Sequence, residues 1–163
     1  MMAFYQLVQI VTVLLTGLAA GLFYSYACSV TGALAKLPDR EYIATFQSIN
    51  AAILNGWFFA SFMGSLIFLP LATWLSYQSD IQFSFGLLLS ATVLYVIGVF
   101  GVTVFGNVPL NNMIARFDLD AATPKDILSL RERFERPWNN LNLIRTVAAV
   151  LSFLLAVLSI NDP

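Results

Sequence analysis

The sequence predicts an all-α integral membrane protein in which four transmembrane helices form a single bundle. Three observations lead to this fold class: charged residues make up only 10% of the chain, hydrophobic residues make up 59%, and the charges are separated by four long uncharged stretches. A soluble domain carries about a quarter charged residues, so these charges are too few to cover a surface in water. We expect residues 1–163 to form one membrane domain.

The uncharged stretches define the four predicted spans, because a helix needs about 20 mostly apolar residues to cross the hydrocarbon core. The stretches run from Met1 to Ala35, Tyr42 to Ser79, Ile81 to Ala115 and Thr146 to Asn161. The last stretch is short, and we extend it back to Pro137, which suits the first turn of a helix. The predicted spans cover about residues 5–34, 51–76, 82–106 and 137–160.

The basic residues predict the orientation of these spans. All eight Lys and Arg residues lie between spans one and two, between spans three and four, or just inside span four. Basic loops stay in the cytoplasm, so we expect both of these loops to be cytoplasmic and both termini to lie outside, with the protein in the plasma membrane. The net charge of −1 gives no basic face for nucleic acid, so we expect no such partner.

The long connection before span four predicts a helix at about residues 124–135. Thr123, Pro124 and Asp126 provide an N-cap, a first-turn proline and an acidic residue in the first turn. We expect this amphipathic helix to lie on the cytoplasmic membrane surface. The residues expected to face the membrane are Ile127, Leu130 and Phe134, and those expected to face water are Arg131, Glu132, Arg133, Glu135 and Arg136.

Small residues recur at every fourth position in the first two spans. They are Gly17, Gly21, Ser25, Ser29 and Ala33 in the first span, and Ala52, Gly56, Ala60 and Gly64 in the second. In lipid, helices associate where small residues let their backbones approach each other. The two ridges therefore predict close packing, either between spans of one chain or between two copies of it.

Polar side chains gather at the span ends that an alternating four-span topology brings to one side. They include Gln47, Asn50, Asn107, Asn111, Asn112, Trp138, Asn142, Arg145 and Thr146. Arg145 lies about two turns inside span four, where an unpaired charge costs roughly 3 kcal/mol or more, so it is a functional-site candidate. Pro109 should end or kink span three just after Asn107 and free carbonyls for these amides. We therefore predict a small-molecule pocket at the cytoplasmic helix ends.

The absence of histidine limits the chemistry of such a pocket. With no histidine and a single cysteine, Cys28, the chain lacks the residues for an intramolecular disulfide or a Ser-His-Asp triad. The usual histidine-dependent zinc, non-haem iron and haem sites are excluded for the same reason. A base for proton removal would have to be water, the ligand itself, or a loop carboxylate such as Asp118 or Asp120.

The two polar segments, Val104–Asn112 and Trp138–Thr146, resemble the anthrone oxygenase-like family of small four-span membrane proteins. Thr16–Phe23 and Phe46–Asn55 are similar to it as well. The resemblance implies an oxidoreductase that converts anthrones to anthraquinones without a metal, flavin or other cofactor. The motif residues that it carries over are Asn107, Pro109, Asn111, Asn112, Trp138, Asn142, Arg145 and Thr146.

For this chemistry we expect Arg145, Asn107 and Asn142 to be catalytic, because fixed donors in an apolar site stabilise a developing oxyanion. The expected substrate-binding residues are Trp138, Asn111, Asn112, Asn50, Gln47 and Thr146. Whether the protein is an enzyme stays open at this point. The alternatives are a non-catalytic binder of a quinone, pigment or lipid, and an accessory subunit of a larger membrane complex. Expected partners are the bilayer, a small lipophilic aromatic ligand and, for the last alternative, other membrane subunits.

Overall fold

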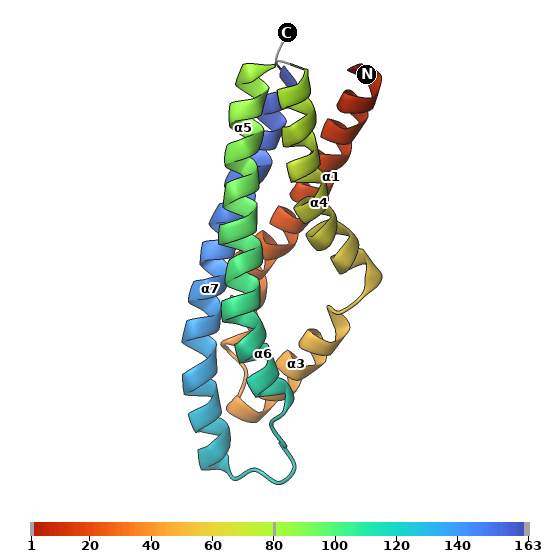
Figure 1. The fold of residues 1–163 in the computed structure, drawn as a ribbon. Coiled ribbons are helices and arrows are strands. Elements are labelled where there is room, and N and C mark those ends of the chain that lie inside the picture. The colour runs from red at the N-terminus through yellow and green to blue at the C-terminus, as the bar shows by residue number, and fades with distance from the viewer. Residues whose placement is uncertain (1, 80, 162–163) are drawn as a thin grey trace.

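The computed structural model describes residues 2–79 and 81–161, and these residues form helices and the connections between them (Figure 1). Four helical stretches are long and apolar enough to cross a membrane, and this confirms the predicted all-α fold with four spans. They are Phe4–Leu34, Gly56–Gln78, Gln82–Ala115 and Pro124–Leu158. Figure 1 shows that the first helix begins and the last helix ends at the same end of the bundle.

The first span is continuous but contains a wider turn near its end. α1 (Met2–Ser25) runs through the π-helical turn η1 (Tyr26–Val30) into α2 (Thr31–Leu34). The Thr31 side chain donates a hydrogen bond of 3.1 Å to the backbone oxygen of Tyr26, five residues earlier, and so stabilises this turn. The observed range agrees with the predicted span at 5–34.

The third span is longer than predicted because it does not end at Pro109. α5 (Gln82–Val93) continues through the π-helical segments η2 (Leu94–Gly101) and η3 (Thr103–Asn107) into α6 (Val108–Ala115). Pro109 lies in the first turn of α6, directly after the change from π-helical to α-helical hydrogen bonding. A proline is tolerated at such a position since its missing N–H interrupts no regular pairing.

The second span begins later than predicted. α3 (Asp39–Ala52) is a separate helix, and α4 (Gly56–Gln78) follows it after a short connection. The side-chain oxygen of Asn55 accepts hydrogen bonds from the N–H groups of Trp57 and Phe58 at 3.0 and 3.1 Å, and this N-cap starts the new helix. The predicted range 51–76 therefore joined the end of α3 to α4. In Figure 1 the two helices form an elbow that stands away from the rest of the bundle, here called the α3–α4 elbow.

α7 (Pro124–Leu158) contains the predicted surface helix and the predicted fourth span as one continuous helix, with Pro137 in its interior. The predicted capping residues are confirmed, because Thr123 and Asp126 form a reciprocal capping box. This continuity corrects the prediction of two separate helices at 124–135 and 137–160. The apolar side of the first segment does not face lipid: Ile127, Leu130 and Phe134 are buried in a cluster with side chains of α3.

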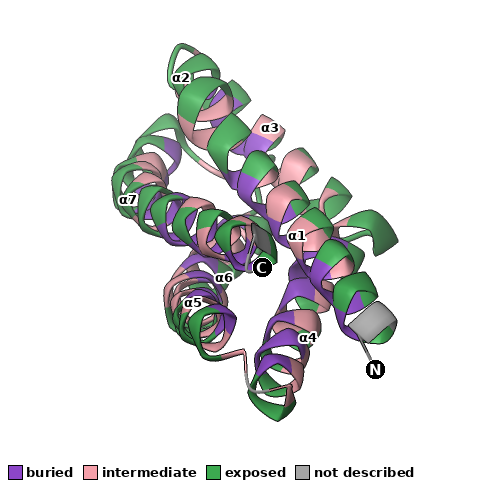
Figure 2. Ribbon diagram, turned by 90° about the horizontal axis from the view of Figure 1, so that it is seen from above, coloured by how far each residue is buried: buried purple, intermediate pink, exposed green. Residues whose placement is uncertain are grey.

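Two clusters of buried side chains hold the helices together. One lies among the four spans and includes Phe23, Phe62, Leu69, Leu88 and Tyr95. The other joins α3, α6 and the start of α7, and includes Tyr42, Phe46, Ile114, Phe134 and Trp138. Figure 2 looks down the bundle and shows buried residues on the faces that the helices turn toward one another.

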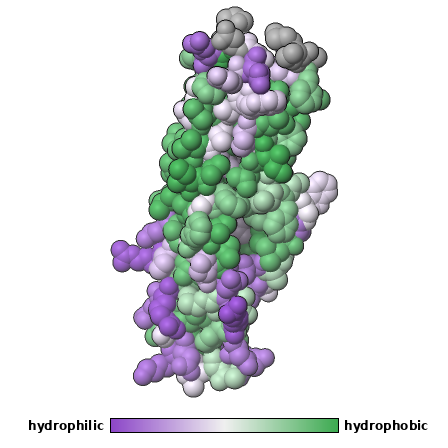
Figure 3. Space-filling model, viewed as in Figure 1, coloured by the Kyte–Doolittle hydropathy of each residue, from purple (hydrophilic) through white to green (hydrophobic). Residues whose placement is uncertain are grey.

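The surface changes character along the bundle. Figure 3 shows hydrophobic residues over most of its length and hydrophilic residues gathered mainly at the end formed by α3, α6 and the start of α7, here called the polar end. This distribution fits a helical membrane protein whose apolar side chains face lipid tails.

Close helix packing within one chain occurs at some of the predicted small-residue positions. A Cβ atom added at Gly17 would lie 3.0 Å from Phe153 of α7, and one at Gly64 would lie 2.8 Å from Leu15 of α1. At Gly21 and Gly56 it would meet no atom of the described residues within 4 Å. The tightest approach is at Gly98 in the third span, where an added Cβ would lie 2.6 Å from the Cβ of Ala148.

Arg131 connects the start of α7 to the segment between α2 and α3, although it was expected to face water. Its side chain is only 12% exposed. Its nitrogens donate hydrogen bonds of 2.8 to 3.0 Å to the backbone oxygens of Ala35 and Leu37 and to the carboxylates of Asp39 and Glu135. One guanidinium therefore satisfies two carbonyls at the end of a helix and two carboxylates at once.

We predict that Gly98→Ala destabilises the bundle. The added methyl group would collide with the Ala148 methyl group, and neither can rotate away, so the two helices must separate at a cost of roughly 1–3 kcal/mol. The expected result is a lower melting temperature of the purified protein in detergent. Gly86→Ala is the control, because an added Cβ there meets nothing described within 4 Å and alanine favours a helix by up to about 1 kcal/mol. Equal melting temperatures for the two variants would contradict the prediction.

We also predict that Arg131→Leu lowers the melting temperature far more than Arg133→Leu. The first change removes four hydrogen bonds around a largely buried guanidinium, and hydrogen bonds to charged groups contribute about 1.5–3 kcal/mol each, without simple additivity. Among the described residues, the exposed Arg133 donates only to the Ser129 carbonyl of its own helix, at 3.3 Å. Similar losses for both variants would show that Arg131 does not hold α3 to α7.

Candidate functional site

A cavity of about 90 Å³ lies near the polar end, between the first span, α3, the third span and α7. It is here called the Arg145 cavity. Most of its lining is apolar or aromatic, including Phe23, Phe46 and Phe58. Four of the predicted site residues line it together: Asn50, Asn111, Trp138 and Arg145. They come from three separate elements, so the helix packing brings them together as the four-span topology predicts.

Arg145 is the one cationic residue in the lining of this cavity, and it is 92% buried, with 8% of its surface exposed. Its guanidinium carbon lies 4.5 Å from the ring centre of Phe23 and 5.2 Å from that of Trp138. Its Nε donates a hydrogen bond of 3.1 Å to the side-chain oxygen of Asn142. The ion pairs among the described residues do not include Arg145, so ring faces and an amide dipole surround its charge in place of a carboxylate.

Trp138 forms a fixed wall of the cavity. Its indole N–H donates a hydrogen bond of 2.8 Å to the side-chain oxygen of Asn111. Its ring packs edge to face on Phe46, with the ring centres 4.9 Å apart, and lies 6.0 Å from the ring of Tyr26. The Asn50 side chain lies at the same place, 3.5 Å from the backbone oxygen of Asn111. These contacts hold the indole in one orientation, with the Arg145 guanidinium over its ring.

Asn107 and Asn142, both expected to be catalytic, are fully buried and are not among the residues that line the cavity. Asn107 donates to the backbone oxygen of Trp138 across 3.5 Å, a long contact. Within the described chain, the side-chain oxygen of Asn107 and the side-chain nitrogen of Asn142 have no hydrogen-bond partner. Since the side-chain oxygen of Asn142 accepts a hydrogen bond from Arg145, this asparagine orients the guanidinium although it does not line the cavity itself.

Three further residues that were predicted to bind substrate do not line the Arg145 cavity. Gln47 donates to the backbone oxygens of Ile114 and Phe117 at 2.8 and 2.9 Å, and so holds the end of α6 to α3. The Thr146 hydroxyl lies 2.7 Å from the backbone oxygen of Asn142 and 3.2 Å from that of Phe23, where it joins α7 to α1. Asn112 is exposed and lines a groove on the surface.

The loop carboxylates considered as bases also lie outside the cavity. Asp118 accepts hydrogen bonds from the N–H groups of Asp120 and Ala121 and so shapes its own loop. Asp120 is almost fully exposed and forms an ion pair of 2.8 Å with Arg40. Both carboxylates line the surface groove that includes Asn112, and neither lines the Arg145 cavity.

Tyr26 is the lining residue with a chemically active side chain that sequence reasoning missed. It belongs to a long apolar span, where a tyrosine looks like a packing residue. The available signal was its helical spacing from Leu22 and Phe23, since residues three and four positions apart share a face of a helix. Both of these residues line the cavity as well.

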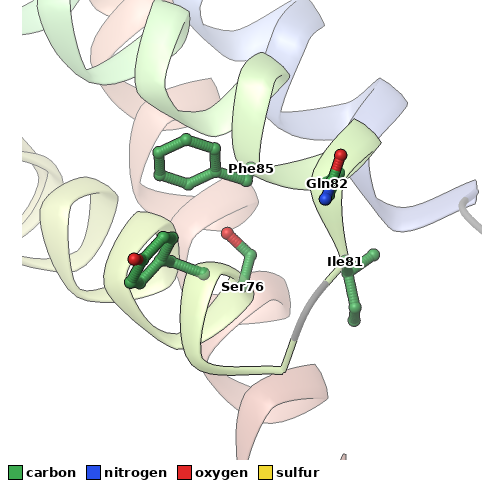
Figure 4. A pocket seen from close by; sticks show the side chains of 5 residues that line it. Ser76, Ile81, Gln82 and Phe85 are labelled. Atoms are coloured by element: carbon green, nitrogen blue, oxygen red, sulfur yellow. The ribbon is translucent and has the colours of Figure 1, made fainter.

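A second cavity, of about 320 Å³, lies at the opposite end of the bundle, where α4 and α5 meet (Figure 4). Its described lining consists of Ser76, Tyr77, Ile81, Gln82 and Phe85. It is larger than the Arg145 cavity, but none of these side chains is charged and none was predicted as a site residue. Among the described residues, no three His, Cys, Asp or Glu side chains are grouped where they could hold a metal ion.

Comparison with known proteins identifies the family. Residues 57–155 match the family model described as anthrone oxygenase, and no curated protein or solved structure matches the chain. The matched segment covers more than half of the 163 residues and includes Asn111, Trp138, Asn142 and Arg145. This chain therefore belongs to the anthrone oxygenase family.

Proposed function

We propose that the protein binds an electron-rich polycyclic phenol of the anthrone class in the Arg145 cavity and promotes its oxidation by O₂. The observation that carries this proposal is the buried guanidinium of Arg145, which lines an aromatic cavity and has no ion-pair partner among the described residues. A buried charge is costly unless an opposite charge compensates it. The oxyanion of an ionised substrate supplies that charge.

The chemistry of an anthrone suits a protein that offers donors and an aromatic wall. Its CH₂ group lies between two aromatic rings and is conjugated to the carbonyl, so loss of one proton leaves an anion with much of its charge on oxygen. This anion transfers one electron to O₂, and the resulting radical and superoxide combine to form a C–O bond. The peroxide then loses water. One anthrone and one O₂ thus give one anthraquinone and one water, with no metal or flavin needed for the electron transfer.

Each residue around the cavity has a specific task in this proposal. Arg145 binds the oxyanion, because a fixed donor in an apolar site stabilises charge more strongly than water does. Asn142 is a positioning residue that orients Arg145 through the hydrogen bond to Nε. Trp138, held by Asn111, provides the flat surface on which the fused rings stack.

The size of the cavity sets a condition on binding. A volume of about 90 Å³ holds the oxygen-bearing edge of a ligand, whereas pockets that enclose drug-sized molecules have about 300–1,000 Å³. Ile53, Leu54 and Phe58 of the α3–α4 elbow form part of the lining. We propose that the elbow moves outward to admit the remaining rings.

We further propose that the cavity faces the cytoplasm in a plasma-membrane protein with both termini outside. Lys36, Arg40, Arg116 and Lys125 belong to the loops and helix ends at the polar end, and basic segments stay on the cytoplasmic side. The lipid bilayer is then the surrounding partner, and it also dissolves an apolar substrate.

We predict that Arg145→Leu lowers the protein-dependent rate of anthrone oxidation at least 100-fold, since loss of one oxyanion donor typically costs a factor of about 10²–10³. The measurement is O₂ consumption by purified protein in detergent, corrected for the uncatalysed rate. Arg133→Leu is the matched control, because Arg133 is exposed on the same helix. Melting temperatures of both variants separate lost chemistry from lost folding.

Three outcomes of this experiment count against the proposal in different ways. Equal rates for both variants would remove Arg145 from the reaction. A wild-type protein that binds anthrone without consuming O₂ would be a non-catalytic binder. A wild-type protein that neither binds nor oxidises anthrone would contradict the assignment of the cavity to this class of substrate.

A further inference from the structure

Tyr26 is the second ionisable residue of the Arg145 cavity. Arg145 and Tyr26 are the two lining residues whose side chains can gain or lose a proton, and they approach from different spans. Both lie beside Trp138, with its ring centre 5.2 Å from the guanidinium carbon and 6.0 Å from the centre of the Tyr26 ring.

The hydroxyl of Tyr26 is not used by the fold. Its backbone oxygen accepts the hydrogen bond from Thr31, but its hydroxyl makes none with any described residue. Tyr26 is half-buried, and its hydroxyl keeps accessible surface, since it is not among the fully buried polar atoms that lack a partner. By contrast, the deeply buried Tyr95 donates to the backbone oxygen of Phe62 at 3.0 Å. Tyr26 therefore adds to this cavity a hydroxyl that has no hydrogen-bond partner among the described residues. The cation of the same cavity, Arg145, has no ion-pair partner among them.

Local structure explains why Tyr26 lies there. Leu22, Phe23 and Tyr26 are spaced by three and four residues, share one face of the first span and all line the cavity. η1 begins at Tyr26, so the hydrogen-bond pattern of the helix changes at this residue. π-Helical turns inside α-helices are frequently found at functional sites.

We propose that Tyr26 is a catalytic residue whose hydroxyl, together with the Arg145 guanidinium, binds the substrate as an oxyanion. This inference rests on the proposed function and adds both a residue and the ionisation state of the ligand. A tyrosine hydroxyl is protonated at neutral pH and donates one hydrogen bond, while the guanidinium provides the positive charge. The two donors favour the anion over the neutral phenol, and the proton that the ligand loses goes to water.

The rest of the cavity lining contains no negatively charged residue that would repel an anion. α3 contributes Ile49 and Asn50, and the third span contributes Thr103, Val108 and Asn111, all of which are uncharged. The two carboxylates nearest in sequence to α6, Asp118 and Asp120, line the surface groove. The Arg145 charge is therefore available to the ligand and to the Tyr26 hydroxyl.

The test uses 2-hydroxyanthraquinone as the probe, because its phenol has no internal hydrogen bond to a carbonyl and its visible absorption changes when the phenol ionises. The probe is titrated with pH on purified full-length protein in detergent and in the same detergent alone. Tyr26→Phe keeps the ring and removes the donor. Tyr24→Phe is the matched control, because Tyr24 precedes Tyr26 by two residues and is exposed. Arg145→Leu removes the charge.

On the wild-type protein we expect the probe to ionise at a pH lower by about one than in detergent alone, because nearby opposite charge and hydrogen bonds favour the charged form. Arg145→Leu should abolish this difference, Tyr26→Phe should reduce it by half or more, and Tyr24→Phe should leave it unchanged. In O₂ consumption, Tyr26→Phe should lower kcat about tenfold with little change in KM, as expected for an interaction that acts in the transition state.

The inference is overturned if Tyr26→Phe titrates like the wild type, if Tyr24→Phe causes the same loss, or if the wild-type protein does not shift the probe. Its failure differs from failure of the proposed function. Anthrone oxidation by a wild-type protein with an unaltered Tyr26→Phe titration rejects the role of Tyr26 alone. A shifted probe without O₂ consumption rejects the oxygenase and leaves the anion site.

Discussion

The contact between α3 and the start of α7 determines the shape of the Arg145 cavity. Phe46 of α3 lies against both Phe134 and Trp138, with ring centres 4.6 and 4.9 Å apart. Trp138 is thereby fixed between a helix outside the main bundle and the guanidinium inside it. Aromatic pairs at such distances add about 0.5–1.5 kcal/mol each to the burial of the rings. Without this packing, one wall of the cavity would be lost.

The charge of Arg145 is held by weak partners, and this distinguishes it from Arg131. Arg131 donates four hydrogen bonds to two carboxylates and two carbonyls, and the two carboxylates compensate its charge. Arg145 has one hydrogen bond to an amide and two aromatic neighbours. Both side chains are largely buried, so the contrast reflects their partners more than their depth. The anion binding proposed for this cavity needs a cation that the fold does not neutralise.

The features that follow from local spacing could be predicted from the sequence. Trp138, Asn142 and Arg145 lie four and three residues apart on one helix, and the structure brings all three to the same side of α7. The four spans follow from the uncharged stretches for a similar reason. Pro137 misled the prediction of helix ends, because packing of α3 against Phe134 and Trp138 outweighs the tendency of proline to start or end a helix. The role of Gln47 depends on contacts with Ile114 and Phe117, which spacing along the chain does not reveal.

The continuity of α7 has a mechanical consequence. Arg131 and Arg145 are separated by fourteen residues of unbroken helix, about 21 Å at a rise of 1.5 Å per residue. A displacement of the charged segment at one end, by a lipid headgroup or a neighbouring protein, would be carried along this rod to the guanidinium. The long helix thus connects the charged segment at the polar end to the Arg145 cavity as one continuous element.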